Sequence, residues 1–142
     1  MNKENEEKSS WRPEGEATPD YDQKLFETLK YIEQEEYELA TKTLDTIIDE
    51  NPNDGTLWGM RASIEIAQEN YHGATKSALE YVKRCPFNIE ALSILGTAQL
   101  GSANYRGAEQ TFKLYLQICP DDDQAKTCLE TAQNALRAID GN

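Results

Sequence analysis

Histidine and cysteine are scarce in this 142-residue sequence, which has one histidine and three cysteines. The cysteines, Cys85, Cys119 and Cys128, form no CxxC pair, and their odd number favours reduced thiols over a disulfide framework or a zinc site. His72 has no partner nucleophile in the pattern, and the chain has no glycine-rich phosphate loop or paired-carboxylate motif. We therefore expect no catalytic residue, no metal site and no cofactor, and predict that the protein is not an enzyme.

Basic residues are also few, with 14 Lys and Arg against 26 Asp and Glu, a formal net charge of −12. Binding to phosphates needs Lys and Arg, so this balance argues against nucleic acid or an anionic membrane as a partner. No apolar run is long enough for a transmembrane helix, and the N-terminus MNKENEEKSS lacks the apolar core of a secretory signal. We expect a cytoplasmic protein without membrane insertion.

The negative charge is concentrated in one part of the chain. Residues 21–54 contain ten acids and three bases, a net charge of −7, whereas residues 55–88 contain three acids and four bases, a net charge of +1. Two interpretations are open at this point: a solvated surface that keeps the protein soluble, or a docking face for a basic partner.

Residues 1–20 are polar, contain Pro13, Gly15 and Pro19, and show no periodicity. They are predicted to form a disordered acidic tail. Trp11 is unusual in such a tail, and it is either incidental or part of a short segment that docks into a groove.

From Tyr21 onward, apolar residues recur at the spacings of amphipathic helices, and no strand alternation competes with them. Three columns of residues repeat at an interval of 34: Tyr37, Tyr71 and Tyr105; Ala40, Ala74 and Ala108; Pro52, Pro86 and Pro120. Proline ends a helix and Asn or Asp can cap the next, so each interval predicts a helix–turn–helix unit.

This pattern resembles the tetratricopeptide repeat (TPR) family. Its large residue early in the first helix is matched by Trp58 and Leu92, and its small residue at the closest helix contact by Ala62 and Gly96. The resemblance implies an all-α fold, a right-handed superhelical stack of helix-turn-helix units in an α-α solenoid. The domains implied are a tail at 1–20, TPR 1 at 21–54, TPR 2 at 55–88, TPR 3 at 89–122 and a C-terminal capping helix at 123–140.

The first unit departs from the family pattern, with Lys24, Glu27 and Thr28 where the family has an aromatic residue, Leu and Gly. An end unit meets water on its outer face, so polar residues are expected there. At the other end, the apolar stripe of residues 129–139 is expected to cover the third unit.

In this family the first helices line a concave groove that binds ligands. The resemblance places these residues in the groove: Leu25, Leu29, Ile32, Gly59, Met60, Ser63, Ile66, Ile94 and Thr97. This set is apolar with small residues between, which suits an extended or helical apolar peptide. The function implied is a non-enzymatic adaptor or chaperone that binds a partner protein or peptide.

The same residues bear on three narrower functions. Family members that bind the acidic tails of heat-shock chaperones use a Lys/Asn/Arg clamp, and the matching positions here, Leu25, Leu29, Met60, Glu90 and Ile94, hold none. A chaperone of type III secretion translocators fits the small acidic three-repeat design, although those proteins have a helical N-terminal region. A self-assembling scaffold, forming a homo-oligomer through the groove face or Trp11, is the other alternative.

Overall fold

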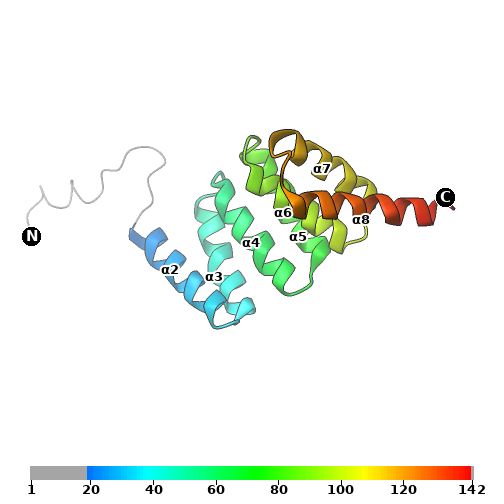
Figure 1. Ribbon diagram of the computed structural model, residues 1–142. Coiled ribbons are helices and arrows are strands. Elements are labelled where there is room, and N and C mark those ends of the chain that lie inside the picture. Colours follow the sequence, from blue (N-terminus) through cyan, green and yellow to red (C-terminus); the bar gives the residue numbers. More distant parts are fainter. Residues whose placement is uncertain (1–18, 142) are drawn as a thin grey trace, which may run out of the picture.

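The computed structural model describes residues 19–141, which form seven helices and, within that range, no strand (Figure 1). The helices are α2 (Pro19–Glu33), α3 (Tyr37–Glu50), α4 (Gly55–Ala67), α5 (Tyr71–Arg84), α6 (Ile89–Gly101), α7 (Tyr105–Ile118) and α8 (Asp123–Ile139). The first helix begins two residues before the predicted Tyr21, because Pro19 suits the first helical position, where its missing N–H costs nothing. Trp11 and the rest of residues 1–18 lie outside the described residues.

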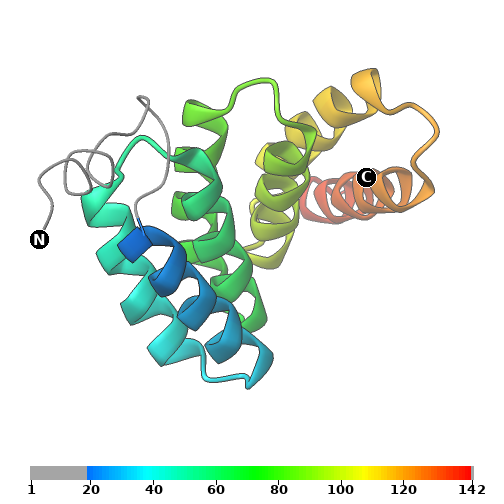
Figure 2. The same cartoon turned by 90° about the vertical axis from the view of Figure 1, so that its left-hand side faces the viewer.

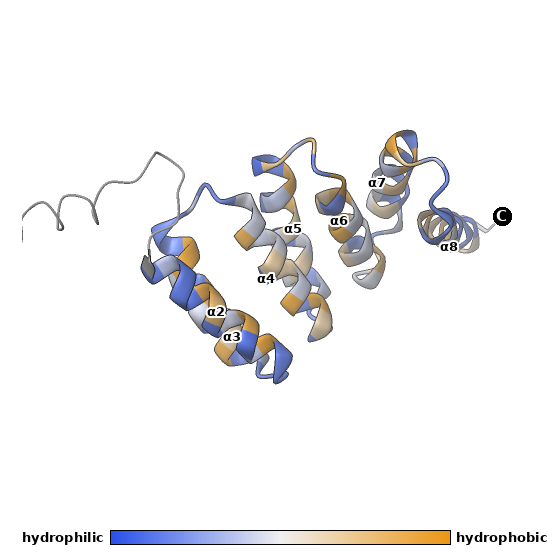
Figure 3. Ribbon diagram, turned by 60° about the vertical axis from the view of Figure 1, so that its left-hand side comes forward, coloured by the Kyte–Doolittle hydropathy of each residue, from blue (hydrophilic) through white to orange (hydrophobic). Residues whose placement is uncertain are grey.

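Each helix packs mainly on the helices next to it in the chain. Figures 1 and 2 show them side by side in chain order, from α2 at one end to α8 at the other. Hydrophobic residues recur along the helices between hydrophilic ones, as Figure 3 shows. The three alanines at the 34-residue spacing, Ala40, Ala74 and Ala108, are fully buried. The fold is an all-α solenoid, as the repeat pattern predicts.

The turn inside each pair of helices has one backbone conformation, repeated three times. Glu35, Glu69 and Ala103 have φ angles of 59°, 59° and 62°, in the left-handed region that residues with a Cβ seldom adopt. In the second and third pairs the next residue, Asn70 or Asn104, caps the following helix by accepting a hydrogen bond from a backbone N–H. The Asn-Tyr dipeptide of the second and third repeats therefore marks a helix start.

A second set of caps joins one helix pair to the next. Asp54, Asn88 and Asp122, again 34 residues apart, accept hydrogen bonds from backbone N–H groups of α4, α6 and α8, respectively, at 3.0–3.3 Å. The Tyr115 hydroxyl also donates to Asp122 at 2.6 Å, and this bond, followed by the one from the Ala125 N–H, lowers the pKa of the Asp122 carboxyl. The period of the sequence is thus a period of helix starts.

The two ends of the stack differ in how they meet solvent. On α2, Gln23, Glu27 and Lys30 are exposed and share one face at helical spacing, so the open end of the stack is mostly polar, with Phe26 as an exposed apolar residue among them. On α8, Ala125 and Ala132 are buried against Ala108 and Phe112 of the preceding helix. This agrees with the expected capping helix and a solvent-facing first unit.

A buried polar pair links the two helices of the second and third units. The Ser77 hydroxyl donates to the Glu65 carboxylate, and the Thr111 hydroxyl donates to the Gln99 side-chain oxygen at 2.7 Å. Glu65 and Gln99 are 34 residues apart, as are Ser77 and Thr111, and all four are buried. An amide therefore makes in one unit the contact that a carboxylate makes in the other.

Ser77→Ala is expected to lower the free energy of unfolding by about 1–3 kcal/mol, because the buried Glu65 Oε1 loses its donor and the carboxylate keeps only the 3.5 Å bond from the Asn70 side-chain amide to Oε2. Glu65→Gln keeps an acceptor and removes a buried charge, so the free energy of unfolding is expected to stay the same or rise by up to about 1 kcal/mol. Urea denaturation followed by circular dichroism measures both effects. Thr111→Ala is the matched variant in the third unit, where the hydroxyl donates to the uncharged Gln99 side chain. A loss in Glu65→Gln as large as that in Ser77→Ala would contradict the assignment.

Candidate functional site

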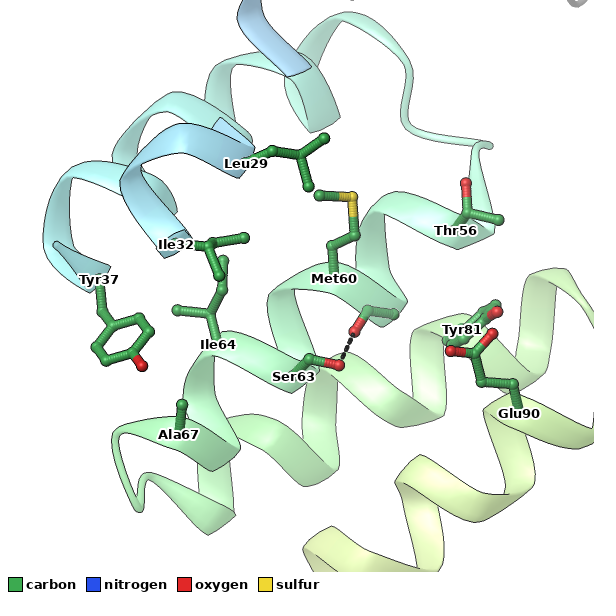
Figure 4. A pocket seen from close by; sticks show the side chains of 11 residues that line it. Leu29, Ile32, Tyr37, Thr56, Met60, Ser63, Ile64, Ala67, Tyr81 and Glu90 are labelled. Atoms are coloured by element: carbon green, nitrogen blue, oxygen red, sulfur yellow. Dashed lines mark hydrogen bonds between the residues drawn. The ribbon is translucent and has the colours of Figure 1, made fainter. Parts of the chain in front are cut away.

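The main candidate site is a pocket of about 340 Å³ between α2 and α4, with α6 at its edge. Helices α2 and α4 both pack on α3, and the pocket lies between their remaining sides (Figure 4). We call it the first-helix pocket, because most of its lining comes from the first helix of each unit. Its lining residues are Leu29, Ile32, Tyr37, Thr56, Gly59, Met60, Ser63, Ile64, Ala67, Tyr81 and Glu90.

Helical spacing explains why these residues share a surface. Leu29 and Ile32 are three apart on α2, and the contribution of α4 recurs at three and four residues from Thr56 to Ala67. The Ser63 hydroxyl donates to the Gly59 carbonyl of its own helix at 3.1 Å, the dashed bond in Figure 4. Because Ser63 satisfies its polar hydrogen within the helix, the surface of the pocket is largely apolar. Leu29 remains half exposed, at 51%.

Tyr81 reaches the pocket from the second helix of its unit because Gly59 has no side chain. A Cβ placed on Gly59 would lie 2.4 Å from Tyr81 Cε2, so any larger residue would occupy the space of the ring. The ring is 3% exposed. Burial, followed by the nearby Glu90 carboxylate, raises the pKa of the Tyr81 hydroxyl, which is therefore protonated at neutral pH.

Five of the predicted groove residues line the pocket: Leu29, Ile32, Gly59, Met60 and Ser63. The other four lie elsewhere. Leu25 packs against the buried cluster around Leu44, and Ile94 packs against the cluster of Ala62, Ala78 and Leu95.

The last two predicted residues, Ile66 and Thr97, are half-buried and exposed, respectively, and are not among the residues that line the pocket. The Thr97 hydroxyl donates to the Ser93 carbonyl at 2.8 Å.

Several lining residues are absent from the predicted groove set: Tyr37, Thr56, Ile64, Ala67, Tyr81 and Glu90. Thr56 and Ala67 follow the same helical spacing as Met60 and Ser63, so periodicity could have included them. Tyr81 had a weaker signal: Gly59 stands inside a helix, where glycine costs stability unless a close contact needs it.

Glu90 is the one charged residue in the lining of this pocket. The bases of α2 and α4 are largely engaged elsewhere. Lys24 lies 3.1 Å from Asp20 and 3.0 Å from Glu50, and Arg61 lies 3.1 Å from Asp45. The pocket is therefore an apolar surface with a carboxylate at its edge.

A second hollow, on another side of the stack, is lined by residues that include Trp58, Arg61 and Lys76. Arg61 and Arg84 lie over the Trp58 ring, 5.9 and 5.1 Å from its centre, and the Arg84 Nε–H donates to the Pro52 carbonyl at 2.7 Å. These contacts join the first two units and give the arginines structural roles.

Within residues 19–141, no group of three or more His, Cys, Asp or Glu side chains could hold a metal ion. In the same range no helix is long and apolar enough to cross a membrane. The three cysteines are free.

No protein-family model matches the sequence, and no curated protein matches it. The fold, in contrast, is similar to solved TPR domains. The Sgt2 TPR domain from Aspergillus fumigatus has a TM-score of 0.78 and 21% identity, covering 93% of this chain and 89% of that one. The second TPR domain of human RPAP3, solved in complex with the HSP70 peptide SGPTIEEVD, has a TM-score of 0.74 and 20% identity. The match covers 80% of this chain and 95% of that domain. The TPR2B domain of yeast Sti1, solved as a pHsp70 complex, has a TM-score of 0.72 and 16% identity. The match covers 81% of this chain and 97% of that domain.

Proposed function

We propose that this chain, whose fold is that of a TPR domain of three repeats and a capping helix, is a non-enzymatic adaptor or chaperone that holds an apolar segment of a partner protein. The partner contacts the first-helix pocket, which is the ligand-binding part of a concave groove. We place this function in the cytoplasm, on the basis of the composition of the chain.

The observation that carries this proposal is the apolar, accessible lining of the first-helix pocket. Its volume is at the small end of the range for ligand sites, which suits one or two apolar anchor side chains of a partner. Leu29 is half exposed and Ala67 is exposed, so both are available for contact. Apolar groups exposed together on a surface are typical of interaction sites.

An external partner is favoured over self-assembly through the open end of the stack. That end presents Gln23, Glu27 and Lys30, which are polar and exposed, around the exposed Phe26. A stable homo-oligomer contact would require these groups to be desolvated, which costs free energy unless each finds a partner.

Leu29→Asp and Ala67→Asp test the proposal, because both positions are accessible and can take a charge without disturbing the core. Each is expected to weaken binding of the natural partner about tenfold or more, since a charge would be buried against an apolar group. Leu114→Asp is the matched control: Leu114 is 47% exposed, close to Leu29, but lies on α7, the second helix of the third unit.

The measurement has two steps. Partners captured from the source cells by the wild-type protein are identified, and their affinities for all four proteins are then measured with purified components. The proposal requires Leu114→Asp to bind like the wild type. Equal affinity of the wild type, Leu29→Asp and Ala67→Asp, with all three still helical, would show that the pocket is not the binding site.

A further inference from the structure

We infer that the segment held by the first-helix pocket is cationic as well as apolar: it carries a lysine or arginine beside its apolar anchors. This inference rests on the proposed function, and it specifies the chemistry of the partner. It follows from the position of the acidic side chains around the pocket and from the engagement of the bases.

Acidic side chains flank the apolar lining on two helices. Glu90, on α6, lines the pocket itself. On α2, Asp22 and Glu33 are exposed and lie seven residues before and four residues after Leu29, which puts them on the same helix face. The apolar stripe of α2 therefore has a carboxylate at each end.

Basic side chains do not balance these carboxylates in the described first helices. Lys24 and Arg61 already pair with acids of other helices, and α6 has no Lys or Arg in its sequence IEALSILGTAQLG. Lys30 directly follows Leu29, so it points about 100° around the helix from it, toward the polar open end. The lining of the pocket itself therefore contains no like charge for a partner's cation to meet.

The surroundings of Glu90 suit an ammonium or guanidinium group. Figure 4 shows the Glu90 carboxylate beside Tyr81, with Met60 between them and the apolar side chains of Leu29 and Ile32. The carboxylate and the phenol oxygen are both acceptors, and a lysine has three N–H donors to share. An apolar anchor on Leu29 and Ile32 and a cation at Glu90 would use both ends of the pocket.

An acidic segment would meet the opposite situation. Its carboxylates would lie near Glu90 and the carboxylates of α2, without a base on the same face to neutralise them. Like charges at an interface oppose binding and slow association. The pocket is therefore expected to discriminate against the acidic peptides that some of the similar TPR domains hold.

The test uses two synthetic amphipathic peptides of about four helical turns that share the same leucine stripe. Lysines flank the stripe in the first peptide, and glutamates flank it in the second. By fluorescence anisotropy, the lysine peptide is expected to bind the full-length protein about tenfold or more tightly than the glutamate peptide at low salt. Its affinity is expected to fall as salt is raised to the physiological range. A lysine peptide with serines in place of the leucines is expected to bind weakly, which separates the pocket from general attraction to an acidic protein.

Glu90→Gln is expected to weaken the lysine peptide about two- to fivefold, the range of an accessible ion pair. Asp49→Asn is the matched control, because it removes one exposed acid from α3 and changes the net charge equally. Its affinity for the lysine peptide is expected to equal that of the wild type.

The inference is overturned if the two peptides bind equally, if the glutamate peptide binds more tightly, if neither binds, or if Glu90→Gln and Asp49→Asn have the same effect. The proposed function is judged separately, by the loss of the natural partner in Leu29→Asp and Ala67→Asp. A cationic preference that fails while that loss is observed leaves the pocket as the site for a partner of other chemistry.

Discussion

Phe112→Ala is expected to lower the free energy of unfolding by about 3–5 kcal/mol, as is usual for a buried phenylalanine that leaves a cavity. Phe112 is 2% exposed and lies directly on Gly96: a Cβ at Gly96 would be 2.7 Å from its Cζ. Since Gly96 has no side chain to move into the space, the surroundings cannot refill it easily. The loss would also loosen α6, which carries Glu90.

Urea denaturation followed by circular dichroism measures this effect, and the chain offers a control on the same helix. Leu114→Ala removes a side chain that is 47% exposed, so its free energy of unfolding is expected to change by less than about 0.5 kcal/mol. In the second unit, Ala78 stands at the position of Phe112 and Ala62 at the position of Gly96. Both alanines are buried and belong to one cluster. A similar small effect for both variants would mean that Phe112 does not hold the third unit together.

Gly59→Ala is expected to lower the free energy of unfolding by about 1–3 kcal/mol, because the added methyl group overpacks a filled site. Its Cβ would lie 2.4 Å from Cε2 and 2.6 Å from Cδ2 of Tyr81, which is only 3% exposed. Relief requires the ring to shift, which moves the floor of the first-helix pocket. We therefore expect a lower melting temperature together with weaker partner binding.

A double-mutant cycle identifies the clash with Tyr81. Tyr81→Leu removes the ring, so the double variant Gly59→Ala/Tyr81→Leu is expected to be more stable than the sum of the single effects by about 0.5–3 kcal/mol. Ser93→Ala, at the equivalent position of the third unit, is expected to change the melting temperature little, because Tyr115, which is equivalent to Tyr81 in that unit, instead donates a hydrogen bond to Asp122. Simple additivity in the cycle would show that Gly59 is not needed for the Tyr81 contact.

Much of the fold could be predicted from the sequence, because the repeat is written in residues with local roles. Asn70 and Asn104 cap helices, and the prolines at the 34-residue spacing stand where helices have ended. Such residues act on backbone groups within a few positions of themselves, so their effect does not depend on distant parts of the chain. The helix starts of the first unit were harder to predict. Glu36, before α3, makes no side-chain cap, and α2 begins at Pro19.

The candidate site could be predicted only in part. Leu29 and Ile32 line the pocket, whereas Leu25 and Ile94 are not among its lining residues. A first helix of a solenoid is apolar toward its partner helix, toward the neighbouring unit and toward the groove, so apolar periodicity does not distinguish these directions. The helix α6 is apolar on nearly all sides and illustrates the problem most clearly.

The sequence by itself determined the helices, their caps and their 34-residue repeat, because each of these depends on residues close together in the chain. The tertiary structure decided what the pocket presents. Tyr81 reaches the pocket through the space left by Gly59, and Glu90 lines it from the next unit. Both contributions depend on contacts between residues of different helices. The repeated residues specify how the units stack. The positions at which the repeats differ, such as Gly59, determine which side chains line the pocket.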